Sequence, residues 1–356
     1  MAVYYQTYRP KNFLQIVGQK HVVVTLKNAI IQDKISHALL FTGPRGTGKT
    51  TMARIVTKAL NCLEPNKETG EPCNNCDNCS LINKDRYLDL FEIDAASNRG
   101  IDDIRELRQK VAYKPTQGNY KVYIIDEAHM LTNEAFNALL KTLEEPPKST
   151  IFILCTTEME KVPETIISRC QVHGLRPLQK EEMVKRLIGI CKKENIKASK
   201  DALKIIARTS KGGLRDAIGL LEQTATASNK KISVPIVNGI LGKRFQDTIP
   251  NIIQTFIDKD DSGVMNIIEE EASKGTDFQL LLPEILEYLH EILHAKYELN
   301  NGEEFKEKAE AFDLKHFLLV VDLFNDSFNI LRYNPNPRLL IEKTCIQACR
   351  PEIPGK

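Results

Sequence analysis

Residues 37–60 read HALLFTGPRGTGKTTMARIVTKAL, and this stretch decides the fold of the chain. Inside it, Gly43-Pro44-Arg45-Gly46-Thr47-Gly48-Lys49-Thr50 fits the phosphate-loop pattern G-x-x-x-x-G-K-[ST]. An apolar run of strand length precedes the loop, and residues 51–60 carry apolar side chains at helical spacing. Strand, glycine loop and helix together direct several backbone N–H groups and a helix N-terminus toward one anion.

Each part of this loop has an expected role in binding a nucleoside triphosphate. The glycines let the backbone approach phosphate, Lys49 reaches the β- and γ-phosphates, and the Thr50 hydroxyl ligates Mg²⁺. Thr51 follows directly and is included in the expected nucleotide-binding set. A glycine turn that matches by chance is the alternative, and the flanking strand and helix patterns disfavour it.

Length and composition restrict the classes of protein. A chain of 356 residues exceeds one ordinary core, so two or three domains are expected. No apolar run approaches the length of a membrane span and the N-terminus lacks a signal-peptide pattern, so we expect a cytoplasmic protein without a membrane partner. A net charge of +2 gives no sign of nucleic-acid binding, which would need local patches.

Four of the nine cysteines cluster in an insert of Pro, Gly and Asn at about residues 62–80: Cys62, Cys73, Cys76 and Cys79. Four thiolates suit a closed tetrahedral zinc site, and a loop of small polar residues needs such a metal for its order. We therefore expect structural zinc. An iron–sulfur cluster and unligated surface thiols are the alternatives.

A second motif, Lys121 to His129, begins with a continuous apolar run typical of a strand buried on both faces of a parallel sheet. At its end, Asp126 suits the Mg²⁺ shell, and Glu127 suits orienting or deprotonating the attacking water. A further buried strand, 150–155, ends in Thr156 and Thr157. A hydroxyl there could reach the γ-phosphate or the water, although a strand-end Thr without function is common.

The remaining sequence is mostly helical. Helices are expected at 21–31, 101–111, 133–145, 180–195, 200–209, 214–227, 278–295, 315–331 and 337–348, with another strand at 88–94. Arg215 falls in the first turn of a helix, which invites an anionic ligand or a nearby carboxylate. Arg169 has no acidic partner nearby in sequence and, by position alone, is an ordinary surface arginine. The cations of 101–111 suggest a basic surface, with a solvated helix face as its competitor.

These patterns predict an α/β domain with a parallel sheet and a zinc-binding insert, followed by two all-α domains. We expect the nucleotide-binding domain at 1–178, a helical lid at 179–242 and a helical domain for oligomerisation or partner contact at 243–356. No catalytic motif is visible beyond residue 248.

Motifs along nearly the whole chain resemble one family. They are Tyr8-Arg9-Pro10 with Phe13 and Val17-Gly18-Gln19, the phosphate loop, the cysteine insert, Asp126 to Leu131, Phe136 to Pro147, Ser168-Arg169-Cys170 and Gly213 to Asp216. The set is similar to the gamma/tau subunits of the bacterial DNA polymerase III clamp loader, which are AAA+ ATPases in the clade of replication factor C. The separation of Cys62 and Cys73 is two residues longer than in that family's pattern.

The resemblance implies roles that the residues alone leave open. Lys49 and Glu127 would be catalytic, Thr157 the first sensor of the γ-phosphate and Arg215 the second. Arg169 would be an arginine finger that acts on ATP in the neighbouring subunit, and Tyr8, Arg9 and Val17 would contact base and ribose. Arg99 and Arg105 would face template DNA. The choice of ATP over GTP rests on the resemblance.

The implied activity is that of an ATP hydrolase within the DNA-directed DNA polymerase III holoenzyme. It would use ATP, Mg²⁺ and structural Zn²⁺ to open the sliding clamp and load it on primer-template DNA, in a hetero-pentamer with other loader subunits. A non-hydrolysing structural subunit should have a degraded phosphate loop, and a recombination or fork-maintenance ATPase should lack the cysteine insert. Long family members continue beyond the third domain, so ending at Lys356 indicates a short form or part of a longer chain.

Overall fold

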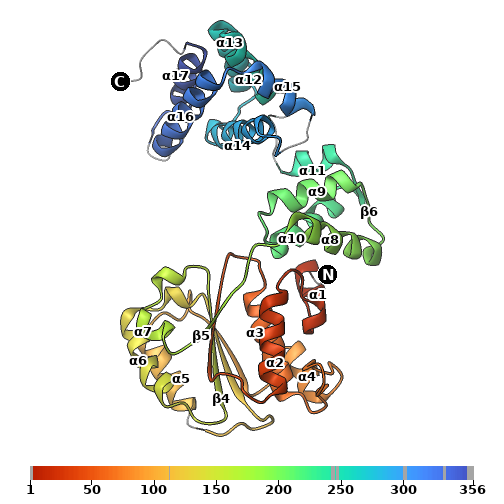
Figure 1. Cartoon of the computed structure of the whole chain (residues 1–356), viewed down its shortest axis with the longest axis vertical. Coiled ribbons are helices and arrows are strands. Elements are labelled where there is room, and N and C mark those ends of the chain that lie inside the picture. The colour runs from red at the N-terminus through yellow and green to blue at the C-terminus, as the bar shows by residue number, and fades with distance from the viewer. Residues whose placement is uncertain are drawn as a thin grey trace. The chain divides into compact units, whose positions relative to one another are not determined.

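The computed structural model describes residues 3–111, 113–241, 245, 248–299, 303–331 and 334–350 (Figure 1). The chain divides into two units, Met1–Ile240 and Leu241–Lys356, each with its own core. The domain boundary expected between residues 242 and 243 lies outside the described residues.

Five parallel strands form the central sheet of the first unit. Their order is β2 (Leu90–Asp94), β3 (Lys121–Asp126), β4 (Thr150–Thr156), β1 (Ala38–Thr42) and β5 (Gln171–Gly174). The three middle strands are buried along nearly their whole length, as their continuous apolar runs predict. The sequence pattern does not predict β5, a short edge strand in which three of the four residues are exposed. Its pattern carries little apolar signal.

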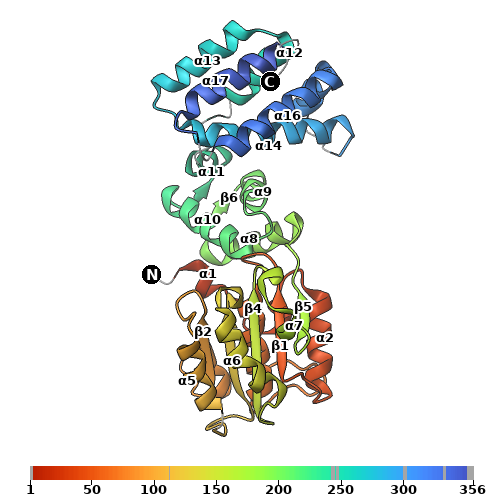
Figure 2. The same ribbon diagram turned by 90° about the vertical axis from the view of Figure 1, so that its left-hand side faces the viewer.

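Helices cover both faces of this sheet, as Figures 1 and 2 show. One face carries α2 (Lys20–Ile31) and α3 (Lys49–Asn61), and the other carries α5 (Ile101–Val111), α6 (Asn133–Glu144) and α7 (Glu164–Ile167). Alternate residues of one strand serve opposite cores: Leu39 and Phe41 pack in the first, whereas Ala38 and Leu40 pack in the second. The sheet is thus a rigid platform, and its carboxyl edge carries the loops.

The sequence predicts that the cysteine insert is a loop. In the structure it is only partly loop, because α4 (Asp77–Asn83) begins inside it. Short turns of helix flank the other loops: α1 (Tyr4–Thr7), η1 (Phe13–Gln15), η2 (Ala128–Met130) and η3 (Met159–Lys161).

Four helices follow the sheet within the first unit: α8 (Lys180–Glu194), α9 (Lys200–Thr209), α10 (Leu214–Ala227) and α11 (Val234–Ile240). The first three confirm the predicted helices, and two short strands accompany them that the sequence pattern does not predict. β6 (Lys197–Ala198) and β7 (Lys231–Ile232) pair in parallel. Each has two residues, which is too short for a periodic pattern.

The described part of the second unit consists of α12 (Thr248–Asp258), α13 (Asp261–Ser273), α14 (Phe278–Lys296), α15 (Glu303–Ala311), α16 (Leu314–Leu331) and α17 (Pro337–Cys349). Its apolar core includes Phe256 and Phe324, whose ring centroids lie 5.6 Å apart. Cys345 and Cys349 are buried in the same core, as small apolar residues. Of all the helices that the structure describes, none combines the length and hydropathy of a membrane span.

Candidate nucleotide-binding and metal sites

A cavity of about 610 Å³ opens where the phosphate loop meets the carboxyl ends of the strands. Thirteen residues of the expected nucleotide set line it: Tyr8, Arg9, Val17, Arg45, Gly46, Thr47, Gly48, Lys49, Thr50, Thr51, Asp126, Glu127 and Arg215. Among the described residues, four of the expected set lie outside this lining: Gly43, Pro44, Thr157 and Arg169. Four separate segments of the sequence thus meet at one cavity.

The glycines of the phosphate loop satisfy two different constraints. Gly43 has φ +135°, and a Cβ there would lie 2.2 Å from the Leu175 carbonyl oxygen, so a side chain would collide with backbone. Gly48 caps α3 with φ +106°, and nothing lies within 4 Å of the position a Cβ would take. Gly48 is the N-cap of α3, and the N-terminus of a helix favours an anion.

Lys49 is buried beneath the loop, with only 6% of its surface exposed. Its ammonium donates to the carbonyl oxygens of Gly43 at 2.8 Å and Pro44 at 3.0 Å. Burial lowers the pKa of Lys49, and the carboxylates of Glu127 and Asp126 oppose that shift. These two hydrogen bonds hold the Lys49 ammonium against the backbone of the phosphate loop.

The two expected Mg²⁺ ligands already lie in contact. The Thr50 hydroxyl donates a 2.8 Å hydrogen bond to Asp126 Oδ2, joining the start of α3 to the end of β3. Asp126 Oδ1 accepts the backbone N–H of Glu127 at 3.1 Å. A hydroxyl and a carboxylate at this spacing form an oxygen donor pair of the kind that Mg²⁺ prefers.

Glu127 is held by the tip of the neighbouring strand. Its backbone lies in the left-handed region at φ +48°, and its Oε2 accepts a 3.1 Å hydrogen bond from the Thr157 hydroxyl. His129 Nδ1 lies 3.5 Å from the same carboxylate oxygen and 3.1 Å from the Thr156 hydroxyl. The sequence analysis assigned His129 no role, although its place two residues after an expected base was a usable signal.

Helix α10 closes the cavity from the helical part of the unit. The Leu214 N–H donates to the Gly46 carbonyl at 3.0 Å, so the first turn of α10 rests on the phosphate loop. The Arg215 guanidinium carbon lies 4.6 Å from the centroid of the Tyr5 ring, a cation–π arrangement. Tyr5 lies on α1 and also lines the cavity, which the sequence analysis did not anticipate.

The N-terminal segment forms another wall of the cavity. Arg9 Nε donates to the Thr51 hydroxyl at 3.1 Å, and burial together with the nearby Arg54 cation lowers the pKa of Arg9. The Tyr8 hydroxyl donates to Glu194 Oε1 at 2.5 Å. Burial and that hydrogen bond raise the pKa of Tyr8 to about 12. These contacts tie residues 8–9 both to α3 and to α8.

Arg54, like Tyr5, lines the cavity although the sequence patterns did not place it in the nucleotide site. Its guanidinium pairs with Asp85 and with Glu92, where Nε donates to Oε2 at 2.7 Å. All three residues line the cavity. Arg54 follows Thr50 by one helical turn on α3, a spacing that could have placed it on the same face. Asp85 has no comparable signal in the sequence.

Arg169 lies away from this cavity and has an acidic partner that sequence distance concealed. Its Nη2 lies 2.5 Å from Glu144 Oε1, at the end of α6, and its Nη1 donates to the Thr165 carbonyl at 2.7 Å. About a third of the Arg169 side chain remains exposed. Glu144 lies 25 residues before Arg169 in the sequence, so the sequence neighbourhood of Arg169 gave no sign of this pair.

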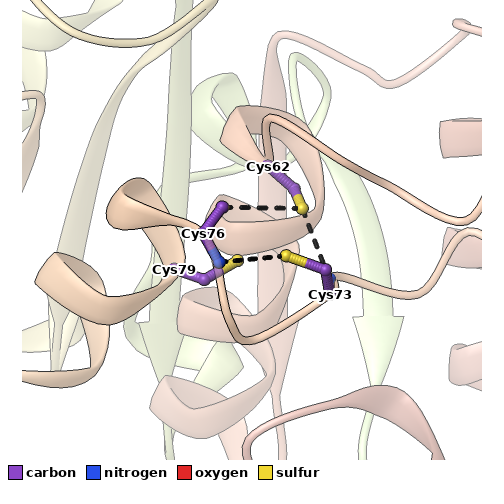
Figure 3. Close-up of side chains that lie close together, drawn as sticks. All are labelled: Cys62, Cys73, Cys76 and Cys79. Atoms are coloured by element: carbon purple, nitrogen blue, oxygen red, sulfur yellow. Dashed lines mark hydrogen bonds between the residues drawn. The ribbon is translucent and has the colours of Figure 1, made fainter.

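The four clustered cysteines converge in the structure. The ligand atoms of Cys62, Cys73, Cys76 and Cys79 all lie within 4.8 Å of one another, and Figure 3 shows their side chains gathered around one point. Cys62 and Cys76 sulfurs are 3.9 Å apart, near the about 3.8 Å edge expected for tetrahedral zinc. Although burial opposes it, hydrogen bonding from the backbone of Cys79 and Leu63 lowers the pKa of Cys76 to about 7. The donor set fits a closed zinc site.

The cations of α5 are largely engaged by acids of the same helix. Arg105 lies 3.1 Å from Asp102, and Lys110 lies 2.7 Å from Glu106, with all four side chains exposed. Arg99 Nε donates to the Ala96 carbonyl at 2.9 Å. This pattern favours a solvated helix face over a basic patch.

Profiles of three domain families match consecutive parts of the chain. The family described as DNA polymerase III, delta subunit, matches residues 18–179. The DNA polymerase III clamp loader subunit, ATPase lid domain, matches 182–230. DNA polymerase III subunits gamma and tau domain III matches 232–342.

Three relatives show how far the likeness extends. The chain is 39% identical to DNA polymerase III subunit tau of Bacillus subtilis, over 97% of this chain and 63% of that one. It is 42% identical to subunit tau of Escherichia coli, over 80% of this chain and 44% of that one. It is 38% identical to subunit gamma of Buchnera aphidicola subsp. Schizaphis graminum, over 96% of both. The chain therefore spans less than two thirds of the two tau subunits.

Solved structures share the fold at low sequence identity. A mutant of Thermotoga maritima RuvB superposes with a TM-score of 0.50 at 18% identity, over 70% of this chain and 80% of that one. This likeness concerns fold alone and agrees with a parallel α/β sheet followed by helices. The identity to full-length gamma subunits and the domain profiles show more: the chain belongs to the family of DNA polymerase III gamma and tau subunits.

Proposed function

We propose that the chain is an ATPase motor subunit of a clamp loader, which uses ATP to open a sliding clamp and load it on primer-template DNA. One observation carries the proposal: the 2.8 Å bond between Thr50 and Asp126 lies in the same cavity as Lys49 and Glu127. That grouping supplies phosphate binding, a metal-organising acid and a base within one site. A structural subunit that only supports its partners would not need this combination of residues.

Residues in and directly around the cavity have separate roles in hydrolysis. Residues 43–51 cradle the phosphates, and the Lys49 ammonium turns from its loop carbonyls to the β- and γ-phosphates. Thr50 and Asp126 hold Mg²⁺, which when bound neutralises charge that builds up on the phosphate oxygens. Glu127 orients the attacking water and accepts its proton, while Thr157 fixes the carboxylate from the next strand.

Arg215 and the N-terminal segment complete the nucleotide site. Arg215 lies at the start of α10 and lines the cavity, so its guanidinium is placed to sense the γ-phosphate. Tyr8, Arg9 and Val17 line the wall formed by the N-terminal segment, where base and ribose would lie. ATP is the proposed nucleotide because the chain is a gamma/tau family member.

Arg169 is proposed to act on the neighbouring subunit. It is partly exposed, and it is not among the described residues that line this chain's own cavity. An arginine supplied across an interface stabilises transition-state charge on the transferring phosphate. The proposal therefore needs partner subunits, and a hetero-pentamer with the second unit as its collar would supply them.

Cys62, Cys73, Cys76 and Cys79 are proposed to hold structural zinc. The sulfur spacing fits tetrahedral coordination, and the donor set is closed, without a fifth side chain among the ligands found. The zinc would supply folding energy to an insert that lacks an apolar core. Elemental analysis of purified protein should give close to one zinc per chain.

The deciding experiment compares ATP turnover of the wild type and Lys49→Ala, alone and with companion loader subunits, clamp and primed DNA. We expect DNA-stimulated hydrolysis and clamp loading by the wild type only. Equal rates for the two proteins would favour a structural subunit instead. Turnover that needs branched DNA and no clamp would favour the recombination or fork-maintenance alternative.

A further inference from the structure

Resting on the proposed nucleotide and zinc sites, we propose that the cysteine insert is a brace for the nucleotide cavity, with Lys58 as the positioning residue that connects them. The connection runs through the Lys58 ammonium and its hydrogen-bond acceptors, none of which is a proposed metal ligand. Metal occupancy of the four cysteines would then set the affinity for nucleotide.

Lys58 is a buried cation that holds three segments together. It lies on α3, two turns beyond the phosphate loop, and only 2% of its surface is exposed. Its ammonium donates to one acceptor from each segment: the Lys11 carbonyl, Asn74 Oδ1 at 2.8 Å and Asn83 Oδ1 at 2.9 Å. An ammonium has three N–H donors, so this set satisfies the group completely. Burying such a charge is costly without these partners.

The three acceptors belong to different structural parts. Asn74 lies in the turn between Cys73 and Cys76, so its position depends on the metal cluster. Asn83 ends α4, the helix that begins just after Cys76. Lys11 belongs to the N-terminal segment, two residues after Arg9. Lys58 therefore joins the metal-binding turn to two segments that line the nucleotide cavity.

A second connection joins the insert to the N-terminal segment that contains Lys11. Glu71, two residues before Cys73 and 7% exposed, accepts the backbone N–H of Phe13 at 2.9 Å. Its other carboxylate oxygen lies 3.1 Å from Lys27 Nζ on α2. The backbone at residues 11 and 13 is thus held by the insert at two points.

The segments held in this way form one wall of the cavity. Tyr8, Arg9 and Pro10 line it from the N-terminal segment, and Asn83 and Asp85 line it from the end of α4. Arg54 forms ion pairs with both Asp85 and Glu92, and all three residues line the cavity. If the insert loses its order, Asn74, Asn83 and Glu71 lose their positions together. The residues of this wall then become ordered only when nucleotide binds. Because ordering them costs conformational entropy, the affinity for nucleotide falls.

The test measures binding of a fluorescent ADP analogue in Mg²⁺ buffer, together with zinc content. Lys58→Met removes all three connections at once and buries an uncharged chain end among polar groups, which could unfold the chain, so the informative variant is Asn74→Gly. Asn74 has φ +61°, which glycine tolerates. The matched control is Asn75→Gly in the same turn, because no hydrogen bond of the Asn75 side chain is found among the described residues. We expect Asn74→Gly to keep one zinc and to bind nucleotide about fivefold more weakly, whereas Asn75→Gly stays near the wild type.

A second arm removes the metal. Wild-type protein is stripped of zinc by a chelator, returned to Mg²⁺ buffer and titrated with the same analogue, with circular dichroism checking that it remains folded. We expect a loss of at least fivefold, restored by added zinc, and a smaller loss in Asn74→Gly because its connection is already broken. Unchanged affinity in folded Asn74→Gly or in folded, stripped wild type would overturn the inference. Wild type that binds no nucleotide would instead overturn the proposed function.

Discussion

The Thr157 hydroxyl donates a 3.1 Å hydrogen bond to Glu127 Oε2, which connects the tips of β4 and β3 across 30 positions of sequence. It fixes one oxygen of the carboxylate proposed to serve as base. A base that is free to rotate spends less time in a productive geometry, so the bond bears on hydrolysis more than on binding.

Replacing Thr157 with valine should separate those two effects. Valine preserves the shape of threonine and removes the donor, so we expect kcat to fall about tenfold with little change in nucleotide affinity. Steady-state hydrolysis and equilibrium binding measure the two quantities. Thr157→Ser retains the hydroxyl and should stay near the wild type. A valine variant with full kcat would remove Thr157 from the mechanism.

Asp126 and Glu127 are adjacent, yet their substitutions should fail differently. Asp126 accepts from Thr50, so Asp126→Asn should raise the Mg²⁺ concentration needed for nucleotide binding. Glu127→Gln should bind nucleotide normally while hydrolysis falls on the order of 10²- to 10⁴-fold. A Mg²⁺ titration of binding and a single-turnover assay distinguish them. Identical defects in both variants would contradict the division of roles.

Arg169 should matter only in an assembly. Arg169→Ala should leave nucleotide binding by the isolated chain unchanged and reduce hydrolysis in the reconstituted loader on the order of 10³-fold. Lys161→Ala is the matched control, because Lys161 is also an exposed cation paired with a carboxylate, at 2.7 Å from Glu158. Full loader activity of Arg169→Ala would exclude an arginine finger at this position.

His173 on β5 should make the first unit sensitive to acid. Burial lowers the pKa of His173 below its ordinary 6.5, with His21 adding to the shift, and its buried Nε2 has no hydrogen-bond partner among the described residues. The unfolded chain therefore binds the proton more readily than the folded one. The stability that depends on neutral His173 is complete above about pH 7 and is lost as the pH falls through 6.5 and below.

Urea unfolding at pH 7.5 and pH 5.5 measures this dependence. His173→Leu should reduce the difference between the two pH values, whereas His290→Gln, an exposed position in the second unit, should not change it. The same pH difference in wild type and His173→Leu would show that other groups account for it.

Much of the first unit could be predicted because its signals are local. The phosphate loop, the runs of β1, β3 and β4, and the helical periods of α5, α9 and α10 each lie within one short segment, and the structure confirms those elements. β5 escaped because it is short and mostly exposed. β6 and β7 escaped because two-residue strands have no period.

The side-chain pairs that join distant segments around the site could not be predicted from local sequence patterns. Arg54 with Asp85, Arg169 with Glu144, and Lys58 with Asn74 each join segments that approach one another only after the chain folds. A single sequence records the residue types, but not which carboxylate a given arginine will meet. The convergence of the cysteines was predictable because their spacing is itself a ligand pattern.

The bond from the Leu214 N–H to the Gly46 carbonyl gives the phosphate loop and helix α10 a shared reference point. A shift of the loop that exceeds the range of a hydrogen bond must also move the start of the helix or break that bond. By thermodynamic reciprocity, any partner that prefers one tilt of α10 changes the affinity for nucleotide by the same factor that nucleotide changes the affinity for the partner. One backbone hydrogen bond therefore gives α10 a direct connection through which a partner bound to the helix and a nucleotide bound to the loop would influence each other.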